Sequence, residues 1–264
     1  MRLRYRFIAA VLGGALGIAP VARADTSVAH RVRIEGSGPA TVVFEAGLGD
    51  TLDVWGRVQS RVAAGCARTL AYNRAGYPGS GAADGPRDAE SIVRELRGEL
   101  QSRGLAPPYV LVGHSLGGLY LQYYARNYPD EVAGLLLVDT THWDQLQRMH
   151  RAAPAMYGGV RALSLLMIGP MRREFLDSEL AGQQVHASPA PAAVPTIVLS
   201  SSRAAPGETP AFRLLVRRLQ DEVAEEYQAR RHSFPLAAGH YIQRDRPGDV
   251  IAAARELAGC PADP

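Results

Sequence analysis

The sequence predicts an α/β fold with a mostly parallel sheet that is covered by helices on both faces. Apolar runs of strand length recur along the chain, and between them apolar residues repeat at helical spacing. Strands that alternate with helices in this way are typical of parallel sheets. With 264 residues, 47% of them hydrophobic, the chain can bury the core of one domain of this class.

The expected strands and helices follow one another along the chain. The strands are expected at Val32 to Ile34, Thr41 to Phe44, Thr69 to Tyr72, Tyr109 to Val112, Gly134 to Val138, Thr196 to Leu199 and, more weakly, Ser233 to Leu236. Two helices are indicated by apolar faces made of Trp55, Val58 and Val62 and of Ile92, Leu96 and Leu100, the second ended by Gly104. Two more are opened by Thr209-Pro210 and by Pro247.

The first two dozen residues are set apart from this domain. Arg2, Arg4 and Arg6 precede an apolar stretch from Phe7 to Val21, and Ala22-Arg23-Ala24 forms a small-residue cleavage site before Asp25. This pattern predicts a secretory signal peptide over residues 1–24, an α/β domain over residues 25–264, and a secreted or periplasmic protein with no stable membrane anchor after processing. An N-terminal membrane anchor is the alternative, but 15 residues broken by Gly and Pro are short for a span.

The net charge of the chain bears on the class of molecule that it binds. The full chain has 29 basic and 26 acidic residues, and the predicted signal peptide holds four arginines and no acid, so the rest carries 25 minus 26, or −1. This balance does not indicate a nucleic-acid partner.

The two cysteines, Cys66 and Cys260, are expected at the same end of the sheet, where export would allow a disulfide. Two separate buried thiols are the alternative.

One interval is far longer than a crossover helix needs. Between Val138 and Thr196 lie 57 residues, which include an apolar and adaptable set. Its members are Met149, Met156, Leu163, Leu165, Leu166, Met167, Ile168 and Met171. We expect a helical cap over about residues 140–194, placed over the carboxyl ends of the strands, where ligands bind in such sheets. A helical excursion packed away from the site is the alternative.

The segment from Tyr109 to Gly118 reads Y-V-L-V-G-H-S-L-G-G, which is a strand, a sharp turn and a helix. Glycine at 113 and 117 permits a tight turn without Cβ collisions, so the hydroxyl of Ser115 is held exposed at its apex. The same turn aims the N–H of Leu116 and the positive end of the helix at an oxyanion that forms there. Ser115 is therefore the candidate nucleophile, and a plain Gly-Ser turn is the alternative.

A serine hydroxyl needs a base to take its proton. His240 lies in a small-residue loop between the last expected strand and the last helix, at the carboxyl edge of the sheet, where a base can reach the serine. Of the other histidines, His30 precedes the fold. The orienting acid is expected at the end of a strand, and Asp139 follows Val138 there. Glu208 and Asp144 remain alternatives, and Asp139 could instead cap a helix.

A second oxyanion donor is expected after the strand Thr41 to Phe44. That loop reads Glu45-Ala46-Gly47-Leu48-Gly49, and the glycines on either side of Leu48 free its N–H to point inward. Leu48 and Leu116 would then supply two backbone donors. This chemistry calls for no cofactor, and His142 and His150 are not spaced as paired helical metal ligands.

Five segments together resemble the α/β-hydrolase fold superfamily, and more narrowly its bacterial serine hydrolases with a Y-D-R-A-G-Y-G-W-S segment. They are E-A-G-L-G at 45 to 49, Y-N-R-A-G-Y-P-G-S at 72 to 80, the serine segment, L-L-L-V-D-T-T-H-W-D-Q at 135 to 145 and A-G-H-Y-I-Q at 238 to 243. The resemblance covers about Arg31 to Leu257 and implies an α/β-hydrolase fold with Ser115 as nucleophile, His240 as base and Leu48 and Leu116 as the oxyanion hole. Two departures stand out: Asn73 replaces the usual Asp, and no Asp follows the strand that ends at Leu199.

These features predict an exported serine hydrolase whose partner is a small-molecule ester, or as the weaker alternative an amide, that is uncharged and partly hydrophobic. The reaction would pass through an acyl-serine intermediate. There are two alternative functions: an acyltransferase that uses the same intermediate, and a non-catalytic binding protein on a hydrolase scaffold. Dehalogenase or epoxide hydrolase chemistry on this fold needs a carboxylate nucleophile, and position 115 is serine.

Overall fold

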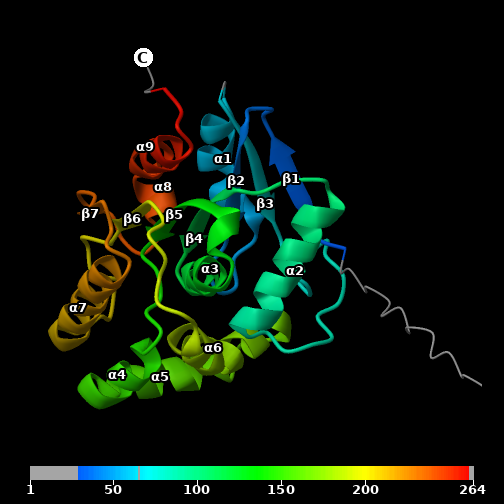
Figure 1. The fold of residues 1–264 in the computed structure, drawn as a ribbon. Helices are drawn as coiled ribbons and strands as arrows, with labels where there is room; N and C mark the ends of the chain where they lie inside the picture. The colour runs from blue at the N-terminus through cyan, green and yellow to red at the C-terminus, as the bar shows by residue number, and fades with distance from the viewer. Residues whose placement is uncertain (1–28, 65, 262–264) are drawn as a thin grey trace, which may run out of the picture.

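A seven-stranded sheet forms the centre of the fold in the computed structural model, which describes residues 29–64 and 66–261 (Figure 1). The strand order is β1-β3-β2-β4-β5-β6-β7; β1 is antiparallel to β3, and every other pair is parallel. The strands are β1 (Val32–Glu35), β2 (Ala40–Glu45), β3 (Ala67–Tyr72), β4 (Tyr109–His114), β5 (Val132–Val138), β6 (Thr196–Leu199) and β7 (Arg231–Ser233). This is the mostly parallel α/β architecture that the sequence predicts.

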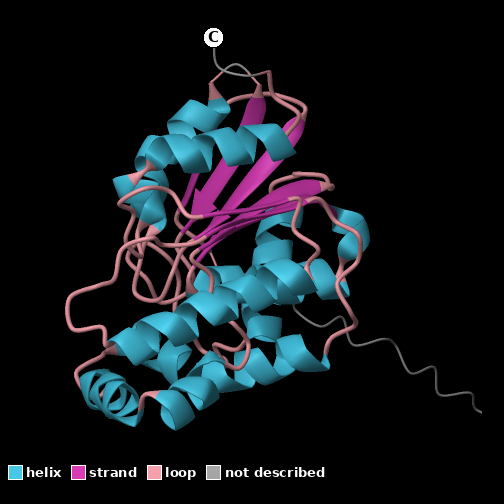
Figure 2. Cartoon of the chain, turned by 90° about the vertical axis from the view of Figure 1, so that its left-hand side faces the viewer, coloured by secondary structure: helices cyan, strands magenta, loops and turns pink. Residues whose placement is uncertain are grey.

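Helices cover both faces of the sheet, so that in Figure 2 the strands lie between helical layers. The helices are α1 (Gly56–Ala63), α2 (Ala89–Ser102), α3 (Leu116–Asn127), α4 (Gln145–Ala152), α5 (Pro154–Ser164), α6 (Gly169–Ala187), α7 (Pro210–Glu226), α8 (Ile242–Asp245) and α9 (Pro247–Leu257), with short 3₁₀ turns at Leu52–Trp55 and Pro129–Glu131. Along β5, Leu135 and Leu137 pack with α2 and α3, whereas Leu136 and Val138 pack with α1 and α9. Both faces of the strand are buried, which is why it reads as a continuous apolar run.

The helix boundaries follow the capping signals in the sequence. Asp88 accepts a hydrogen bond from the N–H of Ser91 at the start of α2 (2.8 Å), and Thr209 accepts one from Phe212 at the start of α7 (3.2 Å). These bonds satisfy N–H groups that have no partner within the helix. Gly104 follows α2 with a φ of +66°, a conformation that favours glycine.

The structure differs from expectation at the two edges of the fold. The last strand is Arg231–Ser233 rather than Ser233 to Leu236, because Pro235 has no N–H for the ladder and Leu236 is 77% exposed. His30 does not merely precede the fold: it is buried, its Nδ1 lies 3.0 Å from a Glu99 carboxylate oxygen, and its ring meets the edge of Tyr72. The chain is therefore packed against α2 before β1 begins.

A disulfide joins Cys66 and Cys260, with 5.7 Å between the two Cα atoms. Cys66 immediately precedes β3, and Cys260 follows α9. Both therefore lie at the amino ends of the parallel strands, as the sequence suggested, and the alternative of two separate thiols is wrong. The bond ties the C-terminal helix to the end of the sheet that lies away from the carboxyl edge.

Helices α4, α5 and α6 follow β5 and gather at one end of the molecule (Figure 1). They fill the long interval before β6, and we refer to them as the cap. Within residues 29–64 and 66–261, no helix is both long enough and apolar enough to cross a bilayer. The predicted signal peptide over residues 1–24 lies outside the described residues.

Candidate active site

Ser115 occupies the sharp turn between β4 and α3. Its φ of 52° and ψ of −123° lie outside the regions that residues with side chains usually adopt, so the packing around it must hold the turn. A Cβ at Gly113 would lie 2.7 Å from the Cα of Gly118, and one at Gly117 would lie 2.4 Å from the carbonyl oxygen of Ala46. The close approach of these segments explains the two glycines from which the turn was predicted.

A hydrogen-bonded chain connects Ser115, His240 and Asp139. The Nε2 of His240 lies 3.1 Å from the Ser115 hydroxyl, and its Nδ1 lies 2.7 Å from a carboxylate oxygen of Asp139. His240 comes from the loop between β7 and α8, and Asp139 directly follows β5. The structure thus brings together the three residues that the sequence singled out. Of the two alternative acids, Asp144 pairs with Arg148 (3.0 Å), and Glu208 makes no hydrogen bond to the imidazole.

Two neighbours hold Asp139 in place. The N–H of Ser201 donates to its second carboxylate oxygen (2.7 Å), and its own N–H donates to the carbonyl of Leu199 (2.7 Å). The segment after β6, where the sequence lacks an acid, therefore supplies a donor that supports the acid coming from β5. An acid from β5 and a donor from β6 can meet because the two strands are neighbours whose carboxyl ends share one edge.

The electrostatics of this pair favour a charged imidazole next to a carboxylate. Burial would raise the pKa of Asp139, but the hydrogen bond and charge of His240 together with the N–H of Ser201 outweigh it and hold that pKa below its usual value. Burial likewise disfavours a charged His240, but Asp139 raises the pKa of the imidazole above its usual value. The pair can therefore accept a proton from Ser115 at low cost.

Leu48 and Leu116 line the same pocket as Ser115. Among the hydrogen bonds of the described residues, the backbone N–H groups of both lack an acceptor, so they are free to bind an oxyanion. The carbonyl of Gly47 accepts a hydrogen bond from Arg74 (2.9 Å). Because the C=O and N–H of a trans peptide point in opposite directions, this bond turns the N–H of Leu48 away from the guanidinium.

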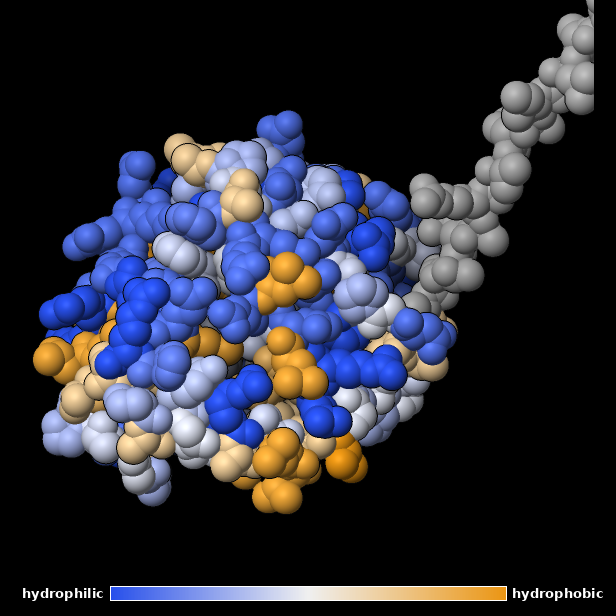
Figure 3. Space-filling view, turned by 90° about the horizontal axis from the view of Figure 1, so that it is seen from below, coloured by the Kyte–Doolittle hydropathy of each residue, from blue (hydrophilic) through white to orange (hydrophobic). Residues whose placement is uncertain are grey.

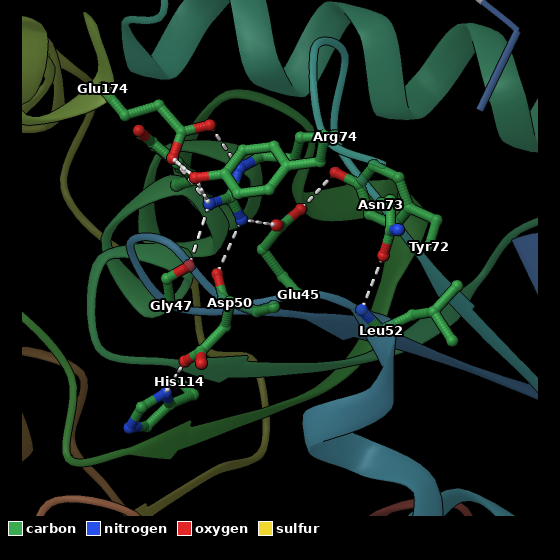
Figure 4. A network of polar contacts seen from close by, with 12 residues as sticks. Glu45, Gly47, Asp50, Leu52, Tyr72, Asn73, Arg74, His114 and Glu174 are labelled. Atoms are coloured by element: carbon green, nitrogen blue, oxygen red, sulfur yellow. Dashed lines mark hydrogen bonds and ion pairs between the residues drawn. The ribbon is translucent and has the colours of Figure 1, made fainter. Parts of the chain in front are cut away.

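Arg74 is the centre of a buried polar network that joins three parts of the fold (Figure 4). It donates to Glu45 at the end of β2 (2.6 Å), to the carbonyl of Ala46 (2.7 Å), and through two nitrogens to Glu174 (2.7 Å each). Glu174 belongs to α6. One guanidinium therefore fixes the loop that carries Leu48 and ties it to the cap.

Tyr77 strengthens the same connection. Its hydroxyl donates to Glu174 (2.7 Å) and accepts from the N–H of Gly49 (3.0 Å). The sequence placed Arg74 inside a recognisable segment but gave it no role. Glu174 was missed entirely, because an acid within an amphipathic helix reads as a solvated residue unless its neighbour from another segment is known.

Asn73, the first departure from the family pattern, makes two hydrogen bonds. Its side-chain oxygen accepts from the N–H of Leu52 (2.7 Å), and its amide nitrogen donates to the carbonyl of Pro78 (2.8 Å). A carboxylate could accept the first bond but could not donate the second. The amide therefore closes the turn before Ser80 and leaves no unpaired charge next to Arg74.

His114 is adjacent to Ser115 in sequence, but its ring contacts the backbone of His240 and not the Ser115 hydroxyl. Its Nε2 lies 2.9 Å from the carbonyl of His240, and because a carbonyl only accepts, this nitrogen carries the proton. Burial lowers the pKa of His114 and thereby favours the neutral ring. Its Nδ1 lies 3.7 Å from Asp50 (Figure 4). His114 thus anchors the backbone of the residue that would act as base.

A pocket of about 220 Å³ opens over Ser115. Leu48 and Leu116 line it from the sheet side, and Met149, Val160 and Phe175 line it from the cap. The cap therefore does lie over the carboxyl edge. Of the eight apolar cap residues that the sequence singled out, however, only Met149 lines this pocket. Several of the others lie on the turn between α5 and α6, and within the described part of the chain they are exposed to solvent.

Within the described residues, no group of three or more His, Cys, Asp or Glu side chains is placed to hold a metal ion. The candidate site is thus made of a hydroxyl, an imidazole, a carboxylate and two backbone donors. These are the parts that acyl transfer through a serine requires.

Comparison with known proteins gives consistent family and fold assignments. Residues 42–254 match the model described as the alpha/beta hydrolase family. The chain is 29% identical over 234 residues to a pimeloyl-[acyl-carrier protein] methyl ester esterase from Chromobacterium violaceum, covering 82% of this chain and 85% of that protein. It is 28% identical over 185 residues to the uncharacterized protein YqjL of Bacillus subtilis, covering 67% and 68%.

Two solved structures show the same fold. One is a thermophilic esterase from Thermogutta terrifontis, with a TM-score of 0.61, 21% identity and coverage of 87% of this chain and 92% of that one. The other is a loop variant of the haloalkane dehalogenase DbeA from Bradyrhizobium elkanii, with a TM-score of 0.62, 19% identity and coverage of 88% and 95%. Since an esterase and a dehalogenase both resemble the chain, the fold alone does not fix the reaction.

Proposed function

The chain belongs to the alpha/beta hydrolase family, and we propose that within this family it is a serine esterase. It cleaves a carboxylic ester of a small, uncharged and partly hydrophobic molecule through an acyl-serine intermediate. The observation that carries the proposal is the chain of hydrogen bonds from the Ser115 hydroxyl through His240 to Asp139, at 3.1 and 2.7 Å. A carboxylate nucleophile is not available at this turn.

In the proposed reaction, Nε2 of His240 takes the proton of Ser115 as the oxygen attacks the ester carbonyl. Asp139 stabilises the imidazolium, and the N–H groups of Leu48 and Leu116 bind the negative charge on the carbonyl oxygen. The imidazolium then protonates the departing alcohol. A water molecule, activated by the same imidazole, hydrolyses the acyl-serine and restores the free hydroxyl.

The lining of the pocket supports a partly hydrophobic substrate. Met149, Val160, Phe175 and Phe212 supply much of the surface above Ser115, together with several polar side chains that include Asp144, Glu179 and Gln183. The relative from Chromobacterium violaceum, whose name describes a methyl ester esterase, favours an ester over an amide.

We also propose that the protein is exported. The pattern over residues 1–24 is that of a signal peptide. The disulfide between Cys66 and Cys260 supports the proposal, because such bonds persist in oxidising compartments and are rare in the cytosol. N-terminal sequencing of the protein recovered outside the cytoplasm tests it: the expected first residue is Asp25.

An active-site label tests the catalytic proposal. A fluorophosphonate should modify Ser115, as located by mass spectrometry, and Ser115→Ala should abolish labelling and lower ester turnover by on the order of a million-fold. Ser178→Ala is the matched control, because Ser178 lines the same pocket but its hydroxyl is bonded to the carbonyl of Phe175 (2.6 Å). A tenth of wild-type turnover left in Ser115→Ala would falsify the assignment, and no labelling of the wild type would leave a binding protein on a hydrolase scaffold.

A second assay separates hydrolysis from acyl transfer. Turnover of a p-nitrophenyl ester is followed while a short-chain alcohol is added, and the products are identified by mass spectrometry. The esterase proposal expects the free acid as the main product at low alcohol concentration. A new ester as the main product would make the protein an acyltransferase that uses the same intermediate.

A further inference from the structure

The turn that joins α5 to α6 carries a concentrated group of exposed aliphatic side chains. The exposed fractions are 57% for Leu163, 74% for Leu165, 78% for Leu166 and 80% for Ile168. We refer to these four residues as the cap tip. Single exposed leucines are common on protein surfaces, but four within six consecutive residues form a patch of the kind that marks an interaction surface.

The segment around the cap tip is strongly basic. Residues 145–173 contain five arginines and no aspartate or glutamate, and because Arg148 pairs with Asp144 and Glu222, four of these five charges are left without an ion pair within the described residues. Arg161 precedes the tip and Arg172 follows it, and in the described part of the chain neither makes an ion pair. Figure 3, which views the molecule from the side of the cap, shows apolar clusters among strongly hydrophilic side chains. The tip thus combines exposed aliphatic groups with the charges of Arg161 and Arg172, which no acid within the described residues neutralises.

We propose that the cap tip docks on the surface of a phospholipid bilayer that contains anionic lipids. Aliphatic side chains next to arginines are the combination that binds this surface, because the apolar groups enter the boundary between headgroups and acyl chains while the guanidinium groups pair with phosphates. The long arginine side chain can reach the phosphates while its stem lies along the apolar region.

Charge decides between a bilayer and a second copy of the chain. In a two-fold dimer formed through the cap tips, the same basic segment would face itself across the interface. Like charges placed opposite each other oppose association, and Arg161 and Arg172, which flank the tip, make no ion pair within the described residues that would relieve them. An anionic surface instead complements the segment and leaves the four aliphatic side chains in an apolar environment.

The docked tip would lie next to the pocket. Val160 lines the pocket from α5, and Leu163 follows it by less than one helical turn. A molecule that partitions into the bilayer surface would therefore be close to the opening above Ser115. This extension, that the substrate is an amphiphilic ester held at a lipid surface, rests on the proposed esterase function; the docking itself does not.

Vesicle binding tests the docking. The protein is isolated as cells process it and sedimented with vesicles of phosphatidylcholine alone or of phosphatidylcholine with phosphatidylglycerol. We expect binding to the anionic vesicles and little to the neutral ones. The double substitution Leu165→Ser and Leu166→Ser should weaken binding at least ten-fold, since two leucines lose their apolar burial. Arg161→Gln should weaken it roughly five-fold.

Matched controls come from other parts of the surface. Leu236 is as exposed as the tip leucines, at 77%, but lies beyond β7, and Arg57 is exposed on α1. Leu236→Ser and Arg57→Gln should bind the anionic vesicles like the wild type. Since all variants share the same N-terminal segment, a difference between them reports the substituted site.

Turnover of a soluble ester, p-nitrophenyl butyrate, without vesicles separates this inference from the proposed function. The tip variants should keep wild-type turnover and wild-type melting temperature, because the tip makes no contact with Ser115 or His240. Equal binding by tip and control variants, or equal binding to neutral and anionic vesicles, would overturn the docking. So would a dimer, detected by light scattering, that the tip substitutions dissolve in a protein that binds no vesicles.

Discussion

Replacing Arg74 with lysine tests whether the buried network aims the oxyanion hole. The guanidinium makes six polar contacts, with Glu45, the carbonyls of Ala46 and Gly47, Tyr77 and both oxygens of Glu174. Lysine keeps the charge but has three donors at one point, so it satisfies at most three of these acceptors. It cannot satisfy Glu45, the carbonyls of Ala46 and Gly47 and both oxygens of Glu174 together.

The size of the effect follows from which contact is lost. Once the carbonyl of Gly47 is released, the peptide that carries the N–H of Leu48 can rotate, and the loss of one oxyanion donor costs up to about 3 kcal/mol of transition-state stabilisation. We therefore expect Arg74→Lys to lower kcat by up to roughly a hundred-fold. KM should change little, because the oxyanion forms only in the transition state.

Arg97→Lys provides the control. Arg97 also donates to a carboxylate through two nitrogens, which lie 3.0 and 2.6 Å from the oxygens of Glu131. This pair, however, is partly exposed and lies outside the pocket. Arg97→Lys should leave kcat unchanged and lower the free energy of unfolding by at most about 1 kcal/mol. The assay is steady-state hydrolysis of p-nitrophenyl butyrate together with the rate of fluorophosphonate labelling and the melting temperature. If Arg74→Lys lowered the melting temperature and left kcat and labelling unchanged, Arg74 would only stabilise the fold and the aiming role would be refuted.

Three further predictions concern the acid, the disulfide and the pocket. Asp139→Asn should lower kcat by on the order of 10⁴ while Glu208→Gln stays near wild type. Because the pKa of His240 is raised, the kcat/KM of the wild type should fall as pH drops through a midpoint above the ordinary histidine value of 6.5, and that midpoint should move to lower pH in Asp139→Asn; an unmoved midpoint would contradict the pairing. Cys260→Ser removes a disulfide between residues 194 positions apart and should lower the free energy of unfolding, measured with urea, by up to about 5 kcal/mol. It should leave kcat unchanged. A loss of kcat in the folded variant would instead show coupling between the two ends of the sheet. The kcat/KM for p-nitrophenyl esters should rise by several-fold per carbon, up to about 0.8 kcal/mol for each methylene, and stop rising near six to eight carbons. Full preference for acetate or steady activity through palmitate would contradict a cap that limits the length of the acyl site.

Features that depend on neighbouring residues were predicted from the sequence. The turn at Ser115 was predicted because Gly113 and Gly117 are required by contacts within that motif and with the adjacent loop. The strands of the sheet were predicted because parallel strands are apolar on both faces. The order of elements along the chain also placed Asp139 and His240 at the same edge.

Contacts between distant segments were not predicted. Arg74 and Glu174 are 100 residues apart, and each alone is an ordinary charged residue on the sequence. The apolar pattern of the cap indicated helices but not which of their apolar side chains lie over the pocket. Leu165 and Leu166 were therefore expected over the site, whereas in the structure they face solvent. Phe175, which does line the pocket, was overlooked because its helix also has an exposed apolar face at Leu176 and Leu180.

The cap is a single uninterrupted insertion between two neighbouring strands, and this makes it exchangeable in recombination. A chimera that receives the segment between β5 and β6 from another member of the family keeps every strand pairing of the sheet. Glu174 sets the condition for success. A donor segment without a carboxylate at that place leaves Arg74 with Glu45 as its remaining acid and removes both hydrogen bonds from the guanidinium to Glu174, each worth about 1.5–3 kcal/mol. Shuffled libraries should therefore retain a carboxylate at 174 wherever Arg74 and Glu45 are kept.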